Sequence, residues 1–379
     1  MRSPKTDSQT AMKIIHFTGM TSYKYGGLER FFVKLVQVSQ NQKHIFVYNS
    51  TPKSSEYLED IAAAGGEIVV IPPQGHIKRF FTMYRFIRQQ RPDAVQSYFD
   101  LLAAFVMIVA AFLAGVKLRI ISLHGLLTTN WKLKLFFKVF GMFATDVISV
   151  SNGVKDNIES IAPALAKRNK VLYMGIELNA ADIADSGSIR QELNIPNDAI
   201  IISNIAFSAP IKGIDILIKA FIEVAQQRKN VYLLQIGSNR NDEFIELLQQ
   251  NGDQDIIDRV VFLGITDHVA KYLPATDIFV LSSRTEAMPL ALMEAAAAGL
   301  PAIGSRIGGI PEAITENENG FTFALEDVAA LSEKILKLVD EPELRRTFSV
   351  NAKKIYQQKF CLTTQAEQYR DFYTKSRSK

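Results

Sequence analysis

Two glutamates, Glu286 and Glu294, lie eight positions apart in the stretch of the sequence that is richest in potential chemistry, residues 282–299. Glu286 falls in a polar turn after an apolar run, and Glu294 falls inside a run that is otherwise almost wholly apolar. A carboxylate in such a run needs a partner, and the neighbouring hydroxyls of a ribose are one, because a carboxylate accepts two hydrogen bonds at once. The alternative is an acidic helix cap at Glu286 and a structural pair at Glu294.

A helix is expected to begin between the two glutamates, near Pro289. Proline fits the first helical turn, where its missing N–H is not needed. The backbone amides of Leu290 and Ala291 then point out of the helix start, where they and the helix dipole attract a phosphate group. The stretch therefore predicts a site for a phosphate and a ribose.

A histidine, His124, follows the β-branched run at residues 119–122, at the carboxyl end of an expected strand. In a parallel sheet, that end of a strand is where an active-site group is expected. The alternative is a structural histidine held by hydrogen bonds. The other histidines lack the spacing of metal ligands and Cys361 is the only cysteine, so the sequence predicts no metal site and a reducing compartment, the cytoplasm.

The elements that position these residues are two series of strand-length apolar runs, separated by helical patterns such as residues 28–39 and 77–91. The first series comprises residues 14–17, 44–48, 68–71, 94–97, 119–122 and 147–150. The second comprises residues 200–204, 232–237, 260–263, 278–281, 301–304 and 320–323. Strands buried on both faces and separated by helices form parallel sheets. We therefore expect an α/β chain of two Rossmann-like domains facing each other across a cleft, with ligands at the carboxyl ends of the strands.

The length of 379 residues fits about two domains. Residues 1–11 are polar and are expected to form a disordered leader. Residues 12–174 are expected to form the N-terminal domain and residues 175–361 the C-terminal domain, with a polar linker near their boundary. Residues 362–379 read as a helix that crosses back to the N-terminal domain.

Charge divides the two halves of the chain. Residues 1–170 hold 22 Lys and Arg against 11 Asp and Glu, whereas the rest holds 21 against 28. A basic half with an acidic partner half suggests that the first half faces something anionic. Residues 101–116 are apolar but too short to span a bilayer, which takes about 18 to 20 residues, so we expect a buried core helix.

Two segments of the basic half interleave cations with aromatic side chains. Residues 77–91 contribute Lys78, Arg85 and Arg88, and residues 131–143 contribute Trp131, Lys132, Lys134 and Lys138. This composition suits a surface that lies in an anionic membrane interface. The alternative is that the aromatic side chains belong to the core and the cations to a solvated face. Binding of nucleic acid is not expected, because no recognition module is present.

The segment around the two glutamates also resembles a known family. The spacing of Glu286 and Glu294, the Ala-x-Ala-x-Gly that follows, Pro301 and the run Gly-Gly-Ile-Pro-Glu at residues 308–312 are similar to the family 4 (group 1) glycosyltransferases of GT-B fold. The family typically has a Gly-Gly-x-Glu-Arg loop after its first strand, and residues 26–30 stand in that place.

A further match is a Lys-Gly pair that opens the first helix of the second domain, here Lys212 and Gly213. The resemblance extends over residues 12–372. It implies that residues 12–174 bind the acceptor and that residues 175–361 bind the nucleotide sugar.

The resemblance also implies roles for individual residues. Lys212 is expected to reach the diphosphate and stabilise the charge of the leaving nucleotide. His124 is expected to contact the transferred sugar near its anomeric carbon. The other expected donor contacts are Gly26 and Gly27 at the pyrophosphate, Glu286 at the sugar hydroxyls, Pro289, Leu290 and Ala291 at the phosphate, Glu294 at the ribose and the loop containing Ile265 at the base.

The sequence departs from the family at three places. The family usually has an arginine five or six residues before the lysine, where this chain has Phe207 and Ala206. Ala287 stands where glycine is usual, and Met174 stands where asparagine is usual. The loss of a phosphate-binding cation costs a few kcal/mol of transition-state stabilisation unless another cation replaces it. The candidates for that replacement are Arg30, Arg240 and Arg284.

By resemblance, we expect a metal-independent, retaining transfer of a hexose or N-acetylhexosamine from a nucleotide diphosphate sugar, UDP-sugar favoured, to a glycan acceptor hydroxyl. The nucleotide sugar is a co-substrate, and no cofactor is expected. The acceptor is expected to be lipid-linked, at the cytoplasmic face of a membrane that the protein contacts peripherally. The alternatives are a non-catalytic transferase-like partner protein and a sugar-nucleotide epimerase or hydrolase on the same scaffold.

Overall fold

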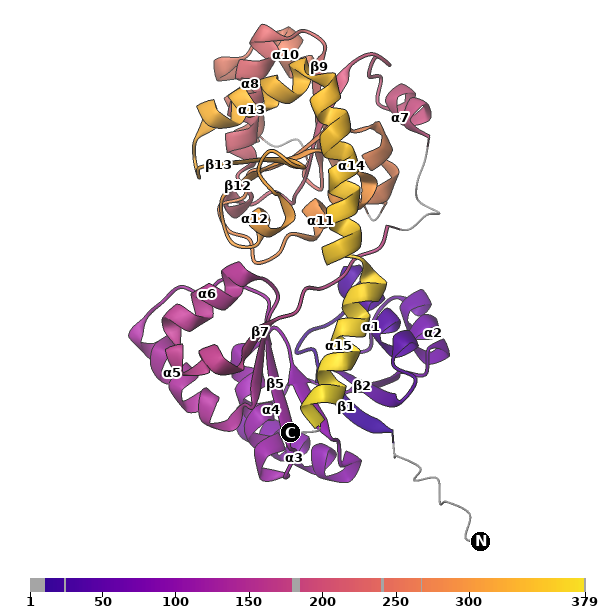
Figure 1. Cartoon of the computed structure of the whole chain (residues 1–379), viewed down its shortest axis with the longest axis vertical. Helices are drawn as coiled ribbons and strands as arrows, with labels where there is room; N and C mark the ends of the chain where they lie inside the picture. The colour runs from indigo at the N-terminus through magenta and orange to yellow at the C-terminus, as the bar shows by residue number, and fades with distance from the viewer. Residues whose placement is uncertain (1–10, 24, 179–184, 240–241, 267, 378–379) are drawn as a thin grey trace. The chain divides into compact units, whose positions relative to one another are not determined.

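The computed structural model describes residues 11–23, 25–178, 185–239, 242–266 and 268–377 (Figure 1). Most of the expected leader, part of the expected linker and Arg240 lie outside the described residues. The chain divides into two compact units. The first comprises Met1–Val150, Val154–Gly175 and Leu362–Lys379, and the second comprises Ser151–Gly153 and Ile176–Cys361.

This division differs from the expected boundaries at two places. Gly175 belongs to the first unit, and Ser151–Gly153 belongs to the second. The physical reason is local, because the hydroxyl of Ser151 donates a hydrogen bond to the carbonyl of Ala287 and the N–H of Gly153 donates one to the carboxylate of Glu312. A boundary set by apolar runs does not reveal such polar contacts.

The first unit contains a parallel sheet with the strand order β3-β2-β1-β4-β5-β6-β7. Its strands are β1 (Met12–Phe17), β2 (Gln42–Tyr48), β3 (Glu67–Val70), β4 (Ala94–Ser97), β5 (Leu118–Leu123), β6 (Asp146–Ser149) and β7 (Asn169–Val171). Its helices are α1 (Gly27–Val38), α2 (Ser55–Ala63), α3 (His76–Gln90), α4 (Leu101–Leu113), α5 (Trp131–Phe143), α6 (Asn152–Ile161), a 3-10 helix (Pro163–Arg168) and α15 (Leu362–Arg377).

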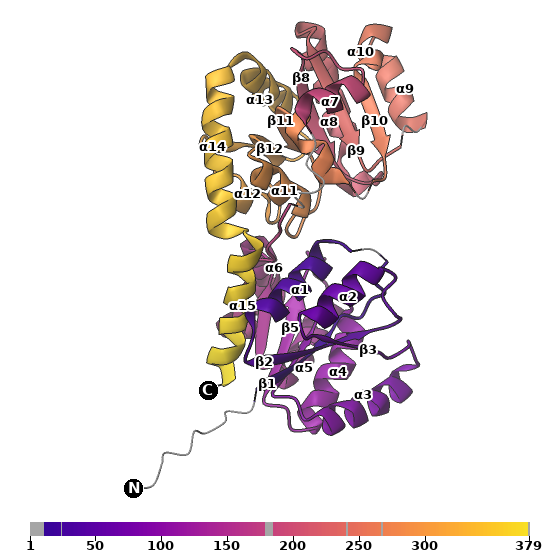
Figure 2. The same cartoon turned by 90° about the vertical axis from the view of Figure 1, so that its right-hand side faces the viewer.

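Helices cover both faces of this sheet, and alternate residues of β1 point to opposite faces. Figure 2 shows α1 and α2 on one side of the sheet and α3 and α4 on the other. Ile14 packs with α1, α2 and α15, whereas its neighbour Ile15 packs with α3 and α4. Both side chains are fully buried, as the apolar runs of the sequence predicted. Figures 1 and 2 both show α15 running alongside α1, where Tyr369 stacks edge-on against Phe31.

A polar network lies inside the first unit. Tyr373 of α15 donates a hydrogen bond to the side-chain oxygen of Gln96, and the amide of Gln96 donates one to the hydroxyl of Ser122. Beside it, the rings of His16 and His44 are hydrogen-bonded to each other at 2.8 Å, and both are fully buried. These hydrogen bonds satisfy most of the polar atoms of the strand residues, although the buried Nε2 of His44 has no partner among the described residues.

The second unit contains a parallel sheet with the strand order β10-β9-β8-β11-β12-β13. Its strands are β8 (Ile200–Ile205), β9 (Val231–Ile236), β10 (Val260–Gly264), β11 (Ile278–Leu281), β12 (Ala302–Ser305) and β13 (Gly320–Phe323). Its α-helices are α7 (Ser186–Glu192), α8 (Ile214–Gln227), α9 (Asp242–Asn251), α10 (Gln254–Asp258), α11 (Leu290–Ala298), α12 (Ile310–Ala313), α13 (Val328–Asp340) and α14 (Pro342–Lys359). Short 3-10 helices span Pro210–Lys212, Val269–Lys271 and Leu273–Ala275.

The second sheet is also buried on both faces. Ile202 of β8 packs in a core built with α8 and α13, whereas Ile201 packs on the opposite side with Ile189 of α7. The expected fold class, two α/β domains with parallel sheets, is confirmed, and each expected strand overlaps an observed one. The strand that the sequence did not reveal is β7, a short edge strand.

One expectation about the first unit is confirmed only in part. Residues 101–116 were expected to be a buried core helix, but α4 buries only one side, through residues such as Ala103 and Met107. Its other side exposes Leu102, Phe112 and Leu113, each to about half of its surface (50%, 45% and 56%). An apolar helix carries no periodicity to tell these sides apart. Within the described residues, no helix combines the length and apolar character needed to cross a bilayer.

Candidate functional site

An ion pair between Lys212 and Glu286 lies at the carboxyl ends of β8 and β11 in the second unit. The Lys212 ammonium lies 2.5 Å from Oε1 of Glu286, and the hydroxyl of Ser283 donates to the same oxygen at 3.0 Å. The two charged side chains are only 17% and 11% exposed. Burial raises the cost of leaving either charge alone, so the pair is held together in this structure.

The loops that carry Lys212 and Glu286 approach each other closely, and this approach positions the ion pair. Gly213, between Lys212 and α8, has a φ of +62°, and a Cβ there would lie 2.1 Å from the carbonyl oxygen of Ser282. The hydroxyl of Ser282 in turn donates to the carbonyl of Gly213 at 2.7 Å. Only glycine fits this conformation without a clash, so the Lys-Gly pair of the sequence has a structural explanation.

Arg284 ties the same two loops together from the other side. Its guanidinium donates to both carboxylate oxygens of Asp215, at 2.8 and 2.9 Å, to Glu326 and to the carbonyl of Pro210. Burial alone raises the pKa of Asp215, but the hydrogen bonds and charge of Arg284 lower it below its usual range. These partners engage all five N–H donors of the guanidinium. Arg284 is therefore not the replacement for the missing phosphate-binding arginine.

An aromatic ring stands where the family usually has that arginine. Ala206 is buried, whereas Phe207 is 55% exposed and its ring centroid lies 5.3 Å from the ammonium of Lys212. Such a contact is a cation–π interaction. Arg30 belongs to the first unit, where its guanidinium lies over the ring of Tyr25. Among the described residues, the structure thus gives Lys212 a carboxylate and a ring as partners.

The helix α11 begins beside the pair, one short loop after Glu286. Pro289 caps it without a side-chain hydrogen bond, and Leu290 and Ala291, half-buried, form its first turn. Glu294 lies one turn further along and is also half-buried. The helix start therefore has the form expected of a phosphate site. The role of Glu294 at a ribose stays a prediction.

The loop that contains Glu286 is supported by the run Gly-Gly-Ile-Pro-Glu. The N–H of Gly309 donates to the carbonyl of Glu286 at 3.3 Å, and a Cβ on Gly309 would lie 2.4 Å from the carbonyl oxygen of Ala287. A side chain at this glycine would push the loop away. This motif therefore positions the carboxylate through the backbone.

Buried polar atoms without a partner lie near the same edge of the sheet. Within the described residues, neither Oδ1 of Asn204 nor the hydroxyl of Ser238 has a hydrogen-bond partner. Ser238 follows β9, and its carbonyl accepts from the N–H of Gly264 at the end of β10. The next residue, Ile265, is 82% exposed. Buried polar atoms of this kind call for water or a ligand.

In the first unit, Gly26 caps α1 and Gly27 begins it. The N–H of Gly26 donates to the carboxylate of Glu29 at 3.1 Å, and the hydroxyl of Ser22 donates to the other oxygen at 2.8 Å. Glu29 is buried, so it fixes the loop rather than reaching a ligand. The φ of Gly26, −96°, is open to any residue, so what glycine contributes here is the absence of a side chain.

His124 comes directly after β5. Its ring centroid lies 4.5 Å from that of Phe99 and 5.6 Å from that of Tyr98, and its buried Nε2 has no hydrogen-bond partner among the described residues. Burial lowers the pKa of His124 to about 4, so the imidazole is neutral at pH 7. A neutral ring with an unsatisfied nitrogen can bind a hydroxyl group.

The predicted site residues thus form two groups. Lys212, Glu286, Pro289, Leu290, Ala291, Glu294 and Ile265 belong to the second unit, and Gly26, Gly27 and His124 belong to the first. The contact of Arg284 with Asp215 and that of Phe207 with Lys212 were not predicted, although both residues follow strands at their carboxyl ends. Across the described ranges, no three His, Cys, Asp or Glu residues gather as a metal cluster.

The residues expected at a membrane or acceptor all lie in the first unit, at exposed positions of α3 and α5. They are Lys78, Arg85 and Arg88 on α3, and Trp131, Lys132, Lys134 and Lys138 on α5. Phe137 and Phe140 of α5 are instead buried. The alternative, that the aromatic residues belong to the core, is therefore correct for these two rings.

Comparison with known proteins agrees with this arrangement. Residues 185–355 match the family model described as glycosyl transferases group 1. The chain is 26% identical over 299 residues, 77% of each chain, to the N-acetyl-alpha-D-glucosaminyl L-malate synthase of Bacillus anthracis. It is 27% identical over 301 residues, 75% of this chain and 77% of the other, to the capsular polysaccharide biosynthesis glycosyltransferase CapM of Staphylococcus aureus.

The fold has a match along nearly its whole length. The crystal structure of Anabaena Alr3699/HepE in complex with UDP superimposes with a TM-score of 0.79 at 20% identity, covering 96% of this chain and 100% of that one. The two parallel sheets, the loop motifs around Lys212 and Glu286 and the family match point the same way. Residues 185–355 are thus similar to the glycosyl transferases group 1, and the chain has the GT-B fold.

Proposed function

We propose that this protein is a retaining, metal-independent glycosyltransferase. It moves a hexose or N-acetylhexosamine from a nucleotide diphosphate sugar, with UDP-sugars favoured, to a hydroxyl of a lipid-linked glycan acceptor in polysaccharide or glycoconjugate synthesis. The observation that carries the proposal is the buried Lys212–Glu286 pair. It lies beside the start of α11, where no side chain caps the backbone N–H groups. The preference for UDP is supported by the HepE structure, which was determined in complex with UDP.

Departure of the nucleotide creates negative charge on the diphosphate. The ammonium of Lys212 has three N–H bonds, so it can keep Glu286 as a partner and still donate to a phosphate oxygen. The amides of Leu290 and Ala291 at the start of α11 add further donors and the positive end of a helix dipole. Groups of this kind, fixed before the reaction, stabilise the transition state without rearrangement.

The sugar becomes oxocarbenium-like as the diphosphate leaves, and the acceptor hydroxyl attacks from the same face and gives its proton to the departing diphosphate. Glu286 holds the sugar hydroxyls, and the neutral His124 of the first unit contacts the sugar near its anomeric carbon. No covalent intermediate on a carboxylate is required in this scheme, in contrast to a retaining hydrolase. The chemistry then depends on stabilisation of the leaving group by Lys212.

The acceptor is proposed from the charge of the first unit, whose exposed cations on α3 and α5 favour an anionic partner. A lipid-linked glycan carries such charge in its phosphates, and it would place the protein at the cytoplasmic face of a membrane. A second candidate is a small soluble acid, because the Bacillus anthracis relative is named for L-malate. The two acceptors differ in whether the reaction needs lipid.

The test is a nucleotide-release assay with UDP- and GDP-sugars, run with membrane lipid extract, with L-malate or with neither. We expect release of one nucleotide only with lipid extract, unchanged by EDTA, and a product whose anomeric configuration by NMR is that of the donor. Lys212→Ala should abolish release, whereas Lys229→Ala, at an exposed pair with Asp255, should not. Release without any acceptor, or inversion in the product, would contradict the proposal.

A further inference from the structure

Many large apolar side chains remain exposed on two neighbouring helices of the first unit, α4 and α5. We call this surface the α4–α5 face. Trp131 and Met142, at the two ends of α5, are 70% and 72% exposed, and Leu135 between them is 54% exposed. The further exposed members are Leu102, Phe112 and Leu113 of α4 and Val139 of α5. So many large apolar side chains on one side of two helices mark an interaction surface.

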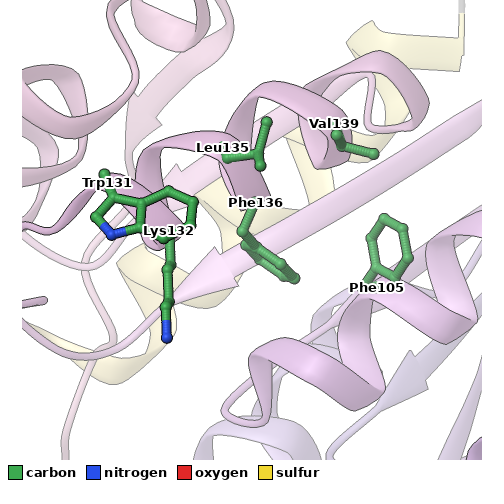
Figure 3. Close-up of a pocket in the computed structure, with 6 residues that line it drawn as sticks. All are labelled: Phe105, Trp131, Lys132, Leu135, Phe136 and Val139. Atoms are coloured by element: carbon green, nitrogen blue, oxygen red, sulfur yellow. The ribbon is translucent and has the colours of Figure 1, made fainter.

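The centre of this face is a groove. A cavity of about 390 Å³ is lined by Phe105, Trp131, Lys132, Leu135, Phe136 and Val139. Figure 3 shows the rings of Phe105 and Phe136 facing one another, with Trp131 and Lys132 at the beginning of α5. The two ring centroids are 5.7 Å apart. Apart from Lys132, the walls offer no charged group, so the groove suits a hydrocarbon chain rather than a polar ligand.

Charge within the segment from α4 to the end of α5 has one sign. The sequence contains no Asp or Glu from residue 101 to residue 145, whereas it contains Lys117, Arg119, Lys132, Lys134 and Lys138. The three lysines of α5 are exposed, and among the described residues none of them forms an ion pair. The cations are thus left to an anionic partner outside the chain.

We propose that the α4–α5 face docks on an anionic lipid bilayer, with an acyl chain in the groove and the lysines of α5 at lipid phosphates. An amphipathic surface with lysines beside tryptophan and leucine has the composition of interfacial helices. A second copy of this chain fits less well, because a two-fold contact would bring the same lysines together. This docking rests on the proposed function in one respect, because a lipid-linked acceptor requires the protein to reach a membrane.

The experiment uses the full chain and the fluorescence of Trp131, the single tryptophan of the sequence. The protein is titrated with vesicles of phosphatidylcholine alone and with vesicles containing phosphatidylglycerol, at low salt and at high salt. We expect a blue shift and co-sedimentation with the anionic vesicles, at least tenfold weaker binding to the neutral ones, and weakening by salt. A protein that shows no shift with anionic vesicles overturns the proposal.

Substitutions locate the contact. Leu135→Ser with Met142→Ser should weaken vesicle binding at least tenfold, and Lys134→Gln and Lys138→Gln should each weaken it about fivefold. The matched controls are Val350→Ser and Lys354→Gln on exposed positions of α14, which should bind as the parent does. Equal losses in the controls, or no loss in the α5 variants, would overturn the assignment of this face. A blue shift that depends on protein concentration without vesicles would replace the bilayer by a second copy.

The same variants separate this inference from the proposed function. Sugar transfer to detergent-solubilised lipid extract should be unaffected by Leu135→Ser with Met142→Ser, because detergent removes the need for docking. Transfer in detergent without any vesicle binding would refute the docking face and leave the function intact. Vesicle binding without transfer to any acceptor would refute the proposed function and leave the docking face intact.

Discussion

Lysines in two regions of the molecule carry the same charge in opposite surroundings. Lys212 of the second unit is mostly buried and lies against a carboxylate, a hydroxyl-supported loop and the ring of Phe207. Lys132, Lys134 and Lys138 of α5 are exposed and border an apolar groove. The first arrangement holds a charge in one position, as a reaction requires. The second arrangement leaves the three lysines to pair with an anionic partner from outside the chain.

The role of the buried lysine is tested most directly by changing the carboxylate that holds it, Glu286. Glu286→Gln keeps the size of the side chain but removes the charge that holds Lys212, and we expect kcat/KM for sugar transfer to fall about 10²- to 10³-fold. The matched control is Asp255→Asn, which disturbs the exposed pair with Lys229 and should leave kcat/KM unchanged. A fall of less than twofold in Glu286→Gln would mean that the pair is structural.

The buried histidines of the first unit offer a second test of what burial does to charge. Burial lowers the pKa of His44 to about 3, and burial together with the charge of the neighbouring His44 lowers the pKa of His16 well below its usual range. The unfolded chain therefore binds more protons below the ordinary value of about 6.5, and stability present above that pH is lost as the pH falls.

We expect the free energy of unfolding in urea to drop by about 4 kcal/mol between pH 7.5 and pH 5.5, since burial keeps His16, His44 and His124 neutral and each contributes about 1.4 kcal/mol over this range. The rings also face Tyr98 and Tyr373, which stay neutral in this range because burial raises their pKa. His44→Gln should flatten the pH dependence, whereas His268→Gln, at an exposed position, should not. A parent protein equally stable at both pH values would contradict the neutral pair.

Arg284 tests whether a paired cation positions the site without reacting. Arg284→Gln removes the bidentate contact with Asp215, and we expect the free energy of unfolding to fall by about 1–2 kcal/mol, since the guanidinium is partly exposed. The matched control is Arg228→Gln, whose exposed pair with Asp340 should leave the urea midpoint unchanged. If Arg284→Gln instead raised KM for the donor with no loss of stability, Arg284 would be a donor-binding residue.

The smallest effect is expected on the α4–α5 face. Met142→Ser removes an exposed apolar side chain, so the free energy of unfolding without lipid should change by no more than about 0.5 kcal/mol. Urea unfolding of the full chain measures this directly. A loss of several kcal/mol would show that another part of the protein covers the face. The α5 lysines would then no longer differ from the buried Lys212 in their exposure.

The sequence predicted the parts of the molecule that depend on local pattern. β1 and β11 are apolar runs buried on both faces, and Gly213 and Gly309 mark close approaches of the backbone. β7 was not predicted because it is three residues long and includes Lys170 at the edge of the sheet. Its pattern does not differ from that of a loop.

The parts that depend on distant partners could not be predicted. Arg284 was considered as a phosphate ligand because nothing in the sequence pairs it with Asp215, 69 positions away. From the sequence, Phe207 is only a residue that differs from the family's usual arginine. The structure shows that its ring contacts Lys212. The exposed side of α4 is hidden for a related reason, since a helix that is apolar all round does not tell which side its neighbours cover.

The position of α15 has a consequence for how this chain is made. Tyr369 and Tyr373 complete the core of the first unit, although that unit's sheet begins at Met12. On the ribosome, every residue of the second unit emerges before these tyrosines do. The second unit therefore has all its parts first, and one apolar face of the N-terminal sheet stays partly uncovered until α15 has been made. During that interval the nascent first unit is the portion that chaperones must shield.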